Sequence, residues 1–271
     1  FRFSEEYDGW WMTTRYKALL HYAGANFVPP GSRIVTGIPL HIFGSQRAQH
    51  QISDVFRKAL KAPAVAVLPQ GFGALCLAIS TNSALAQGRV ALVDIGSRTT
   101  ELICFSDGQY LNHESAGVVL GVGQVYTQVA QKLSSQHQRQ IDAYEVDWAL
   151  REDKPIKIKG GVVERQALEA LVQHYVRPLA TRLHNEMTRL WKECAPGIDH
   201  LLYCGGGSAL LASYLGHFRD DYTILPESQF TNAAGYLEYI RLTSTDQTRA
   251  QDQGAEDSPQ GDASAQKASH A

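Results

Sequence analysis

A continuous apolar run that ends in an aspartate constrains the fold of this chain most. Residues 90–93 read Val-Ala-Leu-Val, and Asp94 follows directly. A run without polar alternation is typical of a strand buried on both faces, as in the sheet of an α/β protein. Residues 96–98 then turn the chain, and residues 99–105 hold enough β-branched and aromatic side chains to form the returning strand. The stretch predicts a buried hairpin with a carboxylate at its mouth.

Such a hairpin has two interpretations. The backbone N–H groups of the turn can hold a phosphate, while the carboxylate holds a metal ion or its water shell. An ordinary hairpin in which Asp94 starts the turn explains the same residues. This stretch is compatible with both interpretations, and the other motifs of the chain are needed to distinguish them.

The overall composition is typical of a globular protein. The chain has 271 residues, of which 44% are hydrophobic and 19% charged, and its formal net charge is -2. Five acidic and two basic side chains give residues 243–271 a charge of -3, which leaves +1 on the rest. That near-neutral body argues against direct nucleic-acid binding, and no apolar run approaches the ~20 residues of a membrane span. Residues 243–271 have almost no apolar side chain and are predicted to be a disordered acidic tail.

The four cysteines indicate a reducing compartment. Cys76, Cys104 and Cys204 lie inside apolar runs, and no two of the four cysteines form a Cys-x-x-Cys pair. This pattern is typical of buried thiols in a cytoplasmic protein, and it argues against a disulfide framework or a zinc site.

Three apolar strands each end in a short turn rich in small residues. The strands end at Leu68, Asp94 and Cys204, and Pro-Gln-Gly-Phe-Gly, Ile-Gly-Ser-Arg-Thr and Gly-Gly-Gly-Ser follow them. In open α/β sheets, ligands bind outside the carboxyl ends of the strands. Glycine lets the backbone approach a phosphate closely, and the start of a following helix adds free N–H groups. A glycine triplet is also common in plain strand-to-helix turns, so the order and spacing of the motifs matter more than any one of them.

Three further elements are expected around these motifs. Asp107-Gly108 is typical of a hairpin turn, and it predicts a third strand over residues 110–115. Residues 164–193 have the apolar stripe of a long helix, which Pro178 should kink or divide. Residues 229–241 are predicted to form a final amphipathic helix.

Taken in order, the motifs resemble those of the actin-like ATPases, specifically the ParM/StbA group that segregates plasmids. This group belongs to the wider fold of actin, Hsp70 and the sugar kinases. The resemblance extends from about residue 33 to residue 242, and the similar segments are residues 35–40, 67–70, 94–101, 115–125, 204–208 and 229–236.

The resemblance implies an α/β protein with the actin-like (ribonuclease H-like) fold. That fold has mixed sheets flanked by helices, and two subdomains with a nucleotide cleft between them. We expect residues 1–88 to form an N-terminally incomplete first subdomain and residues 89–242 the second, with its closing helix. Residues 243–271 would be the disordered tail.

The sequence departs from the family pattern at three places. No counterpart of the family's first phosphate hairpin precedes Arg33. Ser97 stands for a usual glycine, and a serine hydroxyl can donate to a phosphate. Glu101 stands for a usual aspartate, and its longer side chain carries the carboxylate elsewhere.

The resemblance also implies a set of site residues. Asp94 would lie near Mg²⁺ and contact it through water, and Gln70 would orient the attacking water. Four turn residues would cradle the β- and γ-phosphates: Gly96, Ser97, Arg98 and Thr99. Four residues after another strand would pack under the adenosine and the α-phosphate: Gly205, Gly206, Gly207 and Ser208.

The implied function is that of a filament-forming protein that binds ATP and Mg²⁺, polymerises and hydrolyses ATP, in plasmid or DNA segregation. Its partners would be further copies of itself and a DNA-bound adaptor protein. A non-catalytic actin-fold scaffold or fragment is the main alternative, because the first phosphate hairpin is missing. A sugar or acyl kinase is another, although no substrate base stands out in residues 31–85. The sequence leaves open whether the chain hydrolyses nucleotide.

Overall fold

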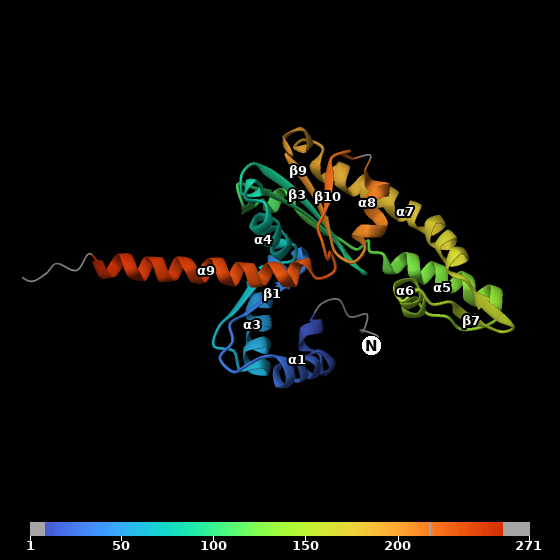
Figure 1. Cartoon of the computed structure of the whole chain (residues 1–271), viewed down its shortest axis with the longest axis horizontal. Helices are drawn as coiled ribbons and strands as arrows, with labels where there is room; N and C mark the ends of the chain where they lie inside the picture. Colours follow the sequence, from blue (N-terminus) through green and yellow to red (C-terminus); the bar gives the residue numbers. More distant parts are fainter. Residues whose placement is uncertain (1–8, 217, 257–271) are drawn as a thin grey trace, which may run out of the picture.

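A six-stranded mixed sheet forms the centre of the computed structural model, which describes residues 9–216 and 218–256. Its strand order is β10-β9-β3-β4-β5, and β6 also pairs with β4. The predicted hairpin is present as antiparallel β3 and β4, while β9 runs parallel to β3 and β10 parallel to β9 (Figure 1). The bounds are β3 (Arg89–Ile95), β4 (Thr100–Ser106), β5 (Gln109–Tyr110), β6 (Ala116–Val118), β9 (His200–Cys204) and β10 (Tyr222–Ile224).

Helices cover both faces of this sheet because successive side chains of a strand alternate between the faces. Ala91, Val93 and Ile95 of β3 face the larger core, which is built with helices α5, α6, α7 and α8. Val90 and Leu92 face helix α4 on the other side. The bounds are α4 (Phe72–Thr81), α5 (Gly123–His137), α6 (Ala143–Arg151), α7 (Arg165–Trp191) and α8 (Ser208–Leu215), and a small hairpin of β7 (Ile156–Ile158) and β8 (Gly161–Val163) follows α6.

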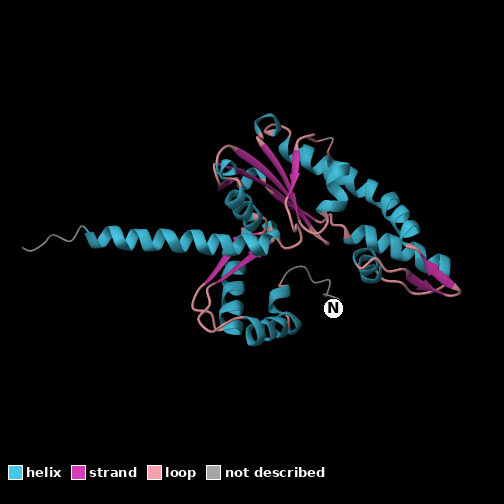
Figure 2. Cartoon of the chain, viewed as in Figure 1, coloured by secondary structure: helices cyan, strands magenta, loops and turns pink. Residues whose placement is uncertain are grey.

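A second, smaller unit contains two parallel strands, β1 and β2, with a core of its own. Ile38, Ile52 and Phe56 are among the buried residues of that core. Figures 1 and 2 show this unit below the six-stranded sheet, with α1 and α3 at its outer side. The bounds are α1 (Thr14–Phe27), β1 (Ile34–Ile38), α2 (Leu40–Phe43), α3 (Gln46–Leu60) and β2 (Val65–Pro69).

Helix α9 (Thr231–Glu256) connects the two units, because it packs along α4 and also contacts β1. Two glycines allow the close crossing of α4 and α9. A side chain at Gly235 would overlap the backbone of Gly73, and a side chain at Gly73 would meet the carbonyl oxygen of Asn232. Beyond this crossing the helix projects from the body of the molecule (Figure 1).

The expected third strand is interrupted in the structure. Strands β5 and β6 both pair with β4, and a 3₁₀ helix (Asn112–Glu114) separates them. Ser115 bridges the gap, because its hydroxyl accepts the N–H of Cys104 at 3.0 Å and donates to the carbonyl of Leu111 at 2.7 Å. The hydroxyl of Ser115 thus takes the place of the backbone carbonyl that would accept the N–H of Cys104 in a regular strand.

Two helical predictions also differ from the structure. Helix α7 continues through Pro178 as one helix, so the predicted division is wrong, while the kink stays a prediction; Val176, Leu179 and Ala180 anchor both sides of the proline in the core. Helix α9 reaches Glu256, whereas disorder was expected from Thr243 onwards. Extending an existing helix avoids the cost of nucleation, and this stretch contains no proline. Residues 257–271 lie outside the described residues, and their disorder stays a prediction.

None of the helices in the described part of the chain combines the length and the apolar character that crossing a membrane requires.

Candidate functional site

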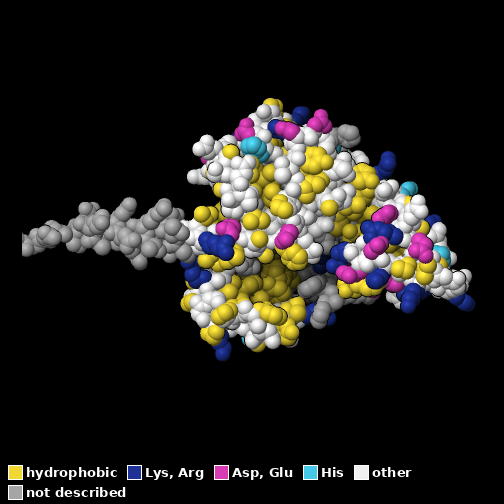
Figure 3. All heavy atoms as spheres, in the orientation of Figure 1, with side chains coloured by type: hydrophobic (Ala, Val, Ile, Leu, Met, Phe, Trp, Pro, Cys, Tyr) yellow, Lys and Arg dark blue, Asp and Glu magenta, His cyan; other side chains and the backbone are white. Residues whose placement is uncertain are grey.

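A cavity of about 1110 Å³ lies between the two units. Figure 3 shows the surface hollowed between the part that carries the six-stranded sheet and the part that carries α1 and α3. Its wall is built by segments that are far apart in the sequence: the start of the chain around Trp10, strand β1, Gln70, the β3–β4 turn, the starts of α5 and α8, helix α6 and the first turns of α9.

Helices α4, α5 and α8 begin beside this cavity. Gln70 precedes α4 by two residues, Gly123 is the first residue of α5, and Gly206 precedes α8 by two residues, and all three residues line the wall. The first N–H groups of a helix have no partner within it, and the helix dipole places positive charge at that end. The cavity is therefore suited to a ligand that carries several negative charges.

The turn between β3 and β4 is held against the start of α5. The N–H of Gly96 donates to the carbonyl of Thr99 at 2.9 Å, which closes the turn. The carbonyls of Gly96 and Ser97 accept the N–H groups of Val122 at 3.1 Å and Gly123 at 2.8 Å. A side chain at Gly123 would lie 2.7 Å from the hydroxyl of Ser97, so a glycine is required for this approach. All four turn residues, 96–99, line the cavity.

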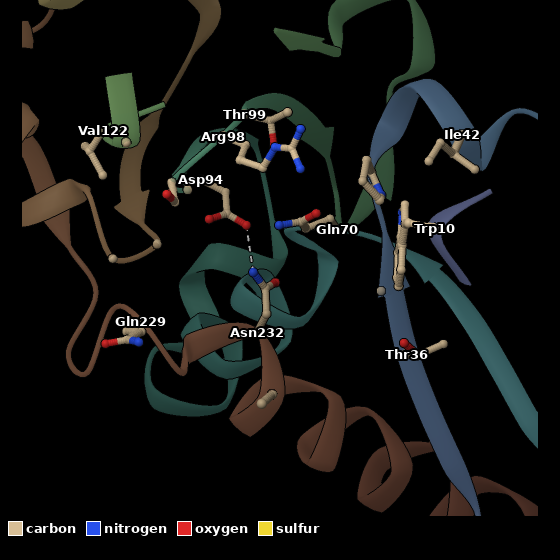
Figure 4. Close-up of a pocket in the computed structure, with 18 of the residues that line it drawn as sticks. Trp10, Thr36, Ile42, Gln70, Asp94, Arg98, Thr99, Val122, Gln229 and Asn232 are labelled. Carbon is tan, nitrogen blue, oxygen red and sulfur yellow. Dashed lines mark hydrogen bonds between the residues drawn. The ribbon is translucent and has the colours of Figure 1, made fainter. Parts of the chain in front are cut away.

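Asp94 lies at the end of β3 and is only 3% exposed. Its Oδ2 accepts the side-chain N–H of Asn232 at 2.7 Å (Figure 4). Burial raises the pKa of Asp94, and hydrogen bonds from Asn232, Cys204 and Gln70 act in the opposite direction. Its Oδ1 faces Gly205, where a side chain would lie 2.5 Å away and where the backbone φ is +83°. Glycine at position 205 thus satisfies both the close approach and the left-handed backbone.

Glu101 lies opposite Asp94 on β4, and its carboxylate is fully buried. Oε2 accepts the N–H of Leu40 at 3.3 Å at the start of α2, and Oε1 has no partner among the described residues. Burial, together with the nearby charge of Asp94, raises the pKa of Glu101 to about 7, and the hydrogen bond from Leu40 acts in the opposite direction. The glutamate thus points toward α2, and it is not among the residues that line the cavity.

The comparisons with known proteins agree with this architecture. One family model, described as "Archaeal actin homologue MreB-like, C-terminal", matches residues 92–217. A ParM filament from Clostridium botulinum has a TM-score of 0.69 and 20% identity, covering 85% of this chain and 74% of that one. MreB 5 of Spiroplasma citri bound to AMPPNP has a TM-score of 0.66 and 14% identity, covering 86% and 77%. A non-polymerisable quadruple mutant of pCBH ParM has a TM-score of 0.71 and 21% identity, covering 86% and 76%. No curated protein sequence matches the chain.

The chain has the actin-like fold. The predicted fold class is thereby confirmed, with its mixed sheets, flanking helices and a cleft between two units. The resemblance to ParM is confirmed at the level of the fold.

Most of the expected site residues of this actin-like chain lie together. Those that line the cavity are Gln70, Asp94, Gly96, Ser97, Arg98, Thr99, Gly205 and Gly206. Gly207 and Ser208 do not line it. Gly207 donates its N–H to the carbonyl of Ile95 at 2.9 Å, and Ser208 is fully buried with no partner for its hydroxyl among the described residues. These two residues support the turn of Gly205 and Gly206 from behind.

Several residues of the wall were not predicted from the sequence. Asn232 lies within the segment 229–236 that resembles the family, but no role was assigned to its side chain. An asparagine near the start of a helix is typical of a cap, and this side chain instead caps a different helix, α4. Tyr236 of α9 and the residues of α6 reach the wall through tertiary packing, for which the sequence contains no local signal.

The donor set of the cavity suits magnesium better than a tightly chelated metal. No group of three or more histidine, cysteine, aspartate or glutamate side chains within the described ranges can hold a metal ion. Mg²⁺ usually keeps several waters and binds through one or two carboxylates and the substrate phosphates. Asp94, at the edge of a wall that suits phosphate, fits that requirement.

Proposed function

We propose that this actin-like protein binds ATP and Mg²⁺ in the central cavity, polymerises into filaments and hydrolyses the nucleotide. The observation that supports the proposal most is the convergence of Gln70, Asp94, the 96–99 turn and Gly205–Gly206 on one cavity, beside which α4, α5 and α8 begin. The fold supports it, because similar structures include a ParM filament and an MreB bound to AMPPNP.

The residues of the cavity would have different roles in phosphoryl transfer. Such catalysis consists mainly of positioning and of stabilising negative charge. The backbone of residues 96–99 and the start of α5 hold the β- and γ-phosphates, and Gln70 orients the attacking water. Gly205 and Gly206 lie under the adenosine and the α-phosphate, with Gly207 and Ser208 behind them. Asp94 would hold Mg²⁺ through water, and the metal would supply positive charge that neutralises the phosphates.

The biological setting is proposed from the same resemblance. The protein self-associates, acts in the cytoplasm and segregates plasmid or other DNA through a DNA-bound adaptor. Residues 1–88 and 89–242 would be its two subdomains. Helix α4 belongs to the first of these ranges but packs on the six-stranded sheet of the second, so the two proposed subdomains are joined through this helix.

A non-catalytic scaffold is the second candidate, and the environment of Asp94 favours it. This carboxylate is 3% exposed, one oxygen is bonded to Asn232 and the other faces Gly205. A cavity that binds nucleotide while its carboxylate is withheld from the metal would support assembly without turnover.

One experiment separates the two candidates. ATP binding is measured by calorimetry, phosphate release by a coupled assay and assembly by light scattering, for the wild type and for Asp94→Ala. The ATPase proposal predicts wild-type turnover and its loss in the variant, because the metal loses its carboxylate. Equal turnover of both proteins would contradict the assignment of Asp94, and binding and assembly without any phosphate release would identify the scaffold.

A further inference from the structure

The side chain of Asn232 joins three elements of the cavity wall. Its Nδ2 donates to Asp94 Oδ2 at 2.7 Å, at the end of β3. Its Oδ1 accepts the N–H of Gly71 at 3.0 Å and the N–H of Ala74 at 3.2 Å, at the start of α4. Asn232 itself belongs to the first turn of α9. One amide thus holds the carboxylate of Asp94 and the start of α4 at a fixed separation, and Figure 4 shows its hydrogen bond to Asp94.

The three partners determine which way this amide points. The two N–H groups of α4 require an acceptor, and the carboxylate of Asp94 requires a donor. Exchanging the oxygen and the nitrogen of the amide would oppose donors to donors and an acceptor to an acceptor. The orientation is therefore unique, and asparagine supplies both functions on one short side chain.

The backbone that carries Asn232 is also fixed in place. The Thr231 side chain is buried, and its hydroxyl donates to the carbonyls of Pro226 and Glu227, both at 3.3 Å. Three residues after Asn232, Gly235 packs against Gly73 so closely that any side chain would overlap. Asn232 therefore cannot shift without moving α9 against α4.

We propose that Asn232 is a positioning residue, which holds Asp94 and the Gln70–Gly71 segment in the relative arrangement that hydrolysis requires. This inference rests on the proposed ATPase function. Gln70 directly precedes Gly71, whose N–H is bonded to Asn232, so the amide controls where the water-orienting side chain begins. The first turn of α9 thereby becomes part of the hydrolytic geometry, although the chemistry takes place on β3 and at the start of α4.

Two substitutions of Asn232 separate its two functions. Asn232→Asp keeps the acceptor for Gly71 and Ala74 and replaces the amide donor to Asp94 with a second carboxyl group, which repels Asp94 when both are ionised, whereas Asn232→Ala removes both the acceptor and the donor. We expect both variants to lower kcat for ATP about tenfold or more while KM changes less than about threefold, since the residue positions groups that act in the transition state. Asn26→Ala is the matched control, because the amide of Asn26 donates to the carbonyl of Tyr22, both residues are exposed, and neither lines the cavity. Wild-type kcat in Asn232→Ala would overturn the proposal.

A second measurement needs no nucleotide. The exchange variant Asp94→Asn with Asn232→Asp restores an amide-to-carboxylate hydrogen bond in the reversed direction and keeps the acceptor for α4. We expect its Tm to exceed that of Asn232→Asp alone, while turnover stays low because the carboxylate has moved to α9. Equal melting temperatures of the two would overturn the coupling. If the wild type hydrolysed no ATP, the proposed function would fail, and the melting temperatures would still decide whether Asn232 fixes Asp94 to α4.

Discussion

At the scale of single residues, the site contains two neighbouring buried carboxyl groups with different partners. Asp94 has a side-chain amide donor and lines the cavity. Glu101, directly opposite on β4, has one backbone N–H donor and one oxygen without a partner among the described residues. Burial raises the pKa of both groups. When ionised, both carboxylates therefore destabilise the folded state.

The pKa of Glu101 predicts a pH dependence of stability. Burial raises it from 4.5 to about 7, so the folded protein keeps a proton that the unfolded chain releases. The free energy of unfolding therefore falls as the pH rises through this range. Glu101→Gln removes this pH dependence. Between pH 4 and pH 8, the free energy of unfolding of the variant should therefore rise by up to about 3 kcal/mol relative to that of the wild type. Urea denaturation across this pH range measures the gain. Glu152→Gln, on the surface, is the control, and parallel curves for all three proteins would refute the prediction.

Gln70 should affect hydrolysis more than binding. It lines the cavity at the start of α4 and is uncharged, so its removal takes away the orientation of the water and no charge. We expect Gln70→Ala to bind ATP within a few-fold of the wild type, to release phosphate more slowly and to form longer-lived filaments. Affinity, phosphate release and light scattering after dilution are measured together, with exposed Gln87→Ala as the control. Rapid disassembly of the Gln70 variant would argue against a water-orienting role.

At the scale of elements, the sequence predicts the buried strands better than the edge of the sheet. The apolar runs of β3 and β9 lie between helical layers on both faces, so burial alone defines them. The third strand is at the edge, where the hydroxyl of Ser115 takes the place of a backbone hydrogen-bond partner. A pattern of apolar residues cannot predict such a hydrogen bond. Helix α7 crosses Pro178 because the packing of its neighbours outweighs a local preference.

The crossing of α4 and α9 predicts a sensitive position. Gly235→Ala places a methyl group against the backbone of Gly73, which cannot move as a flexible side chain would. We expect a loss of about 1–3 kcal/mol in the free energy of unfolding, because the two helices must separate. Gly44→Ala is the matched control, since no atom lies within 4 Å of the added methyl group. Equal urea midpoints of both variants would show that the crossing tolerates the wider spacing.

At the scale of the whole molecule, two units with separate cores meet at a cavity and share α9. Two of the three glycine-rich strand ends converge because β3 and β9 are parallel neighbours in one sheet, whereas the end of β2 belongs to the other sheet and reaches the cavity through the packing of the two units. Residues such as Asn232, Tyr236 and Tyr144 reach the same cavity only through the packing of helices from distant segments. Their positions follow from the assembled fold, so no local pattern could predict them.

A ligand that bridges the two units should stabilise both. We expect ATP with Mg²⁺ to raise the Tm of the wild type, because binding at 100 times the Kd contributes about 2.7 kcal/mol. Removing Mg²⁺ with a chelator should reduce the shift, and Asp94→Ala should abolish the part that depends on the metal. Differential scanning fluorimetry with ATP, with and without Mg²⁺, measures both effects. If the chelator left the Tm shift unchanged, the metal would make no contribution to nucleotide binding at this site.

Helix α9 begins at the cavity with Asn232 and ends far from it. Its 26 residues correspond to a rod of about 39 Å at 1.5 Å per residue. A tilt of about 10° around the first turn displaces the other end by roughly 7 Å, several times the movement of any atom beside Asp94. A small rotation of the first turn of α9, beside the cavity, is therefore amplified along the helix into a much larger displacement of its far end.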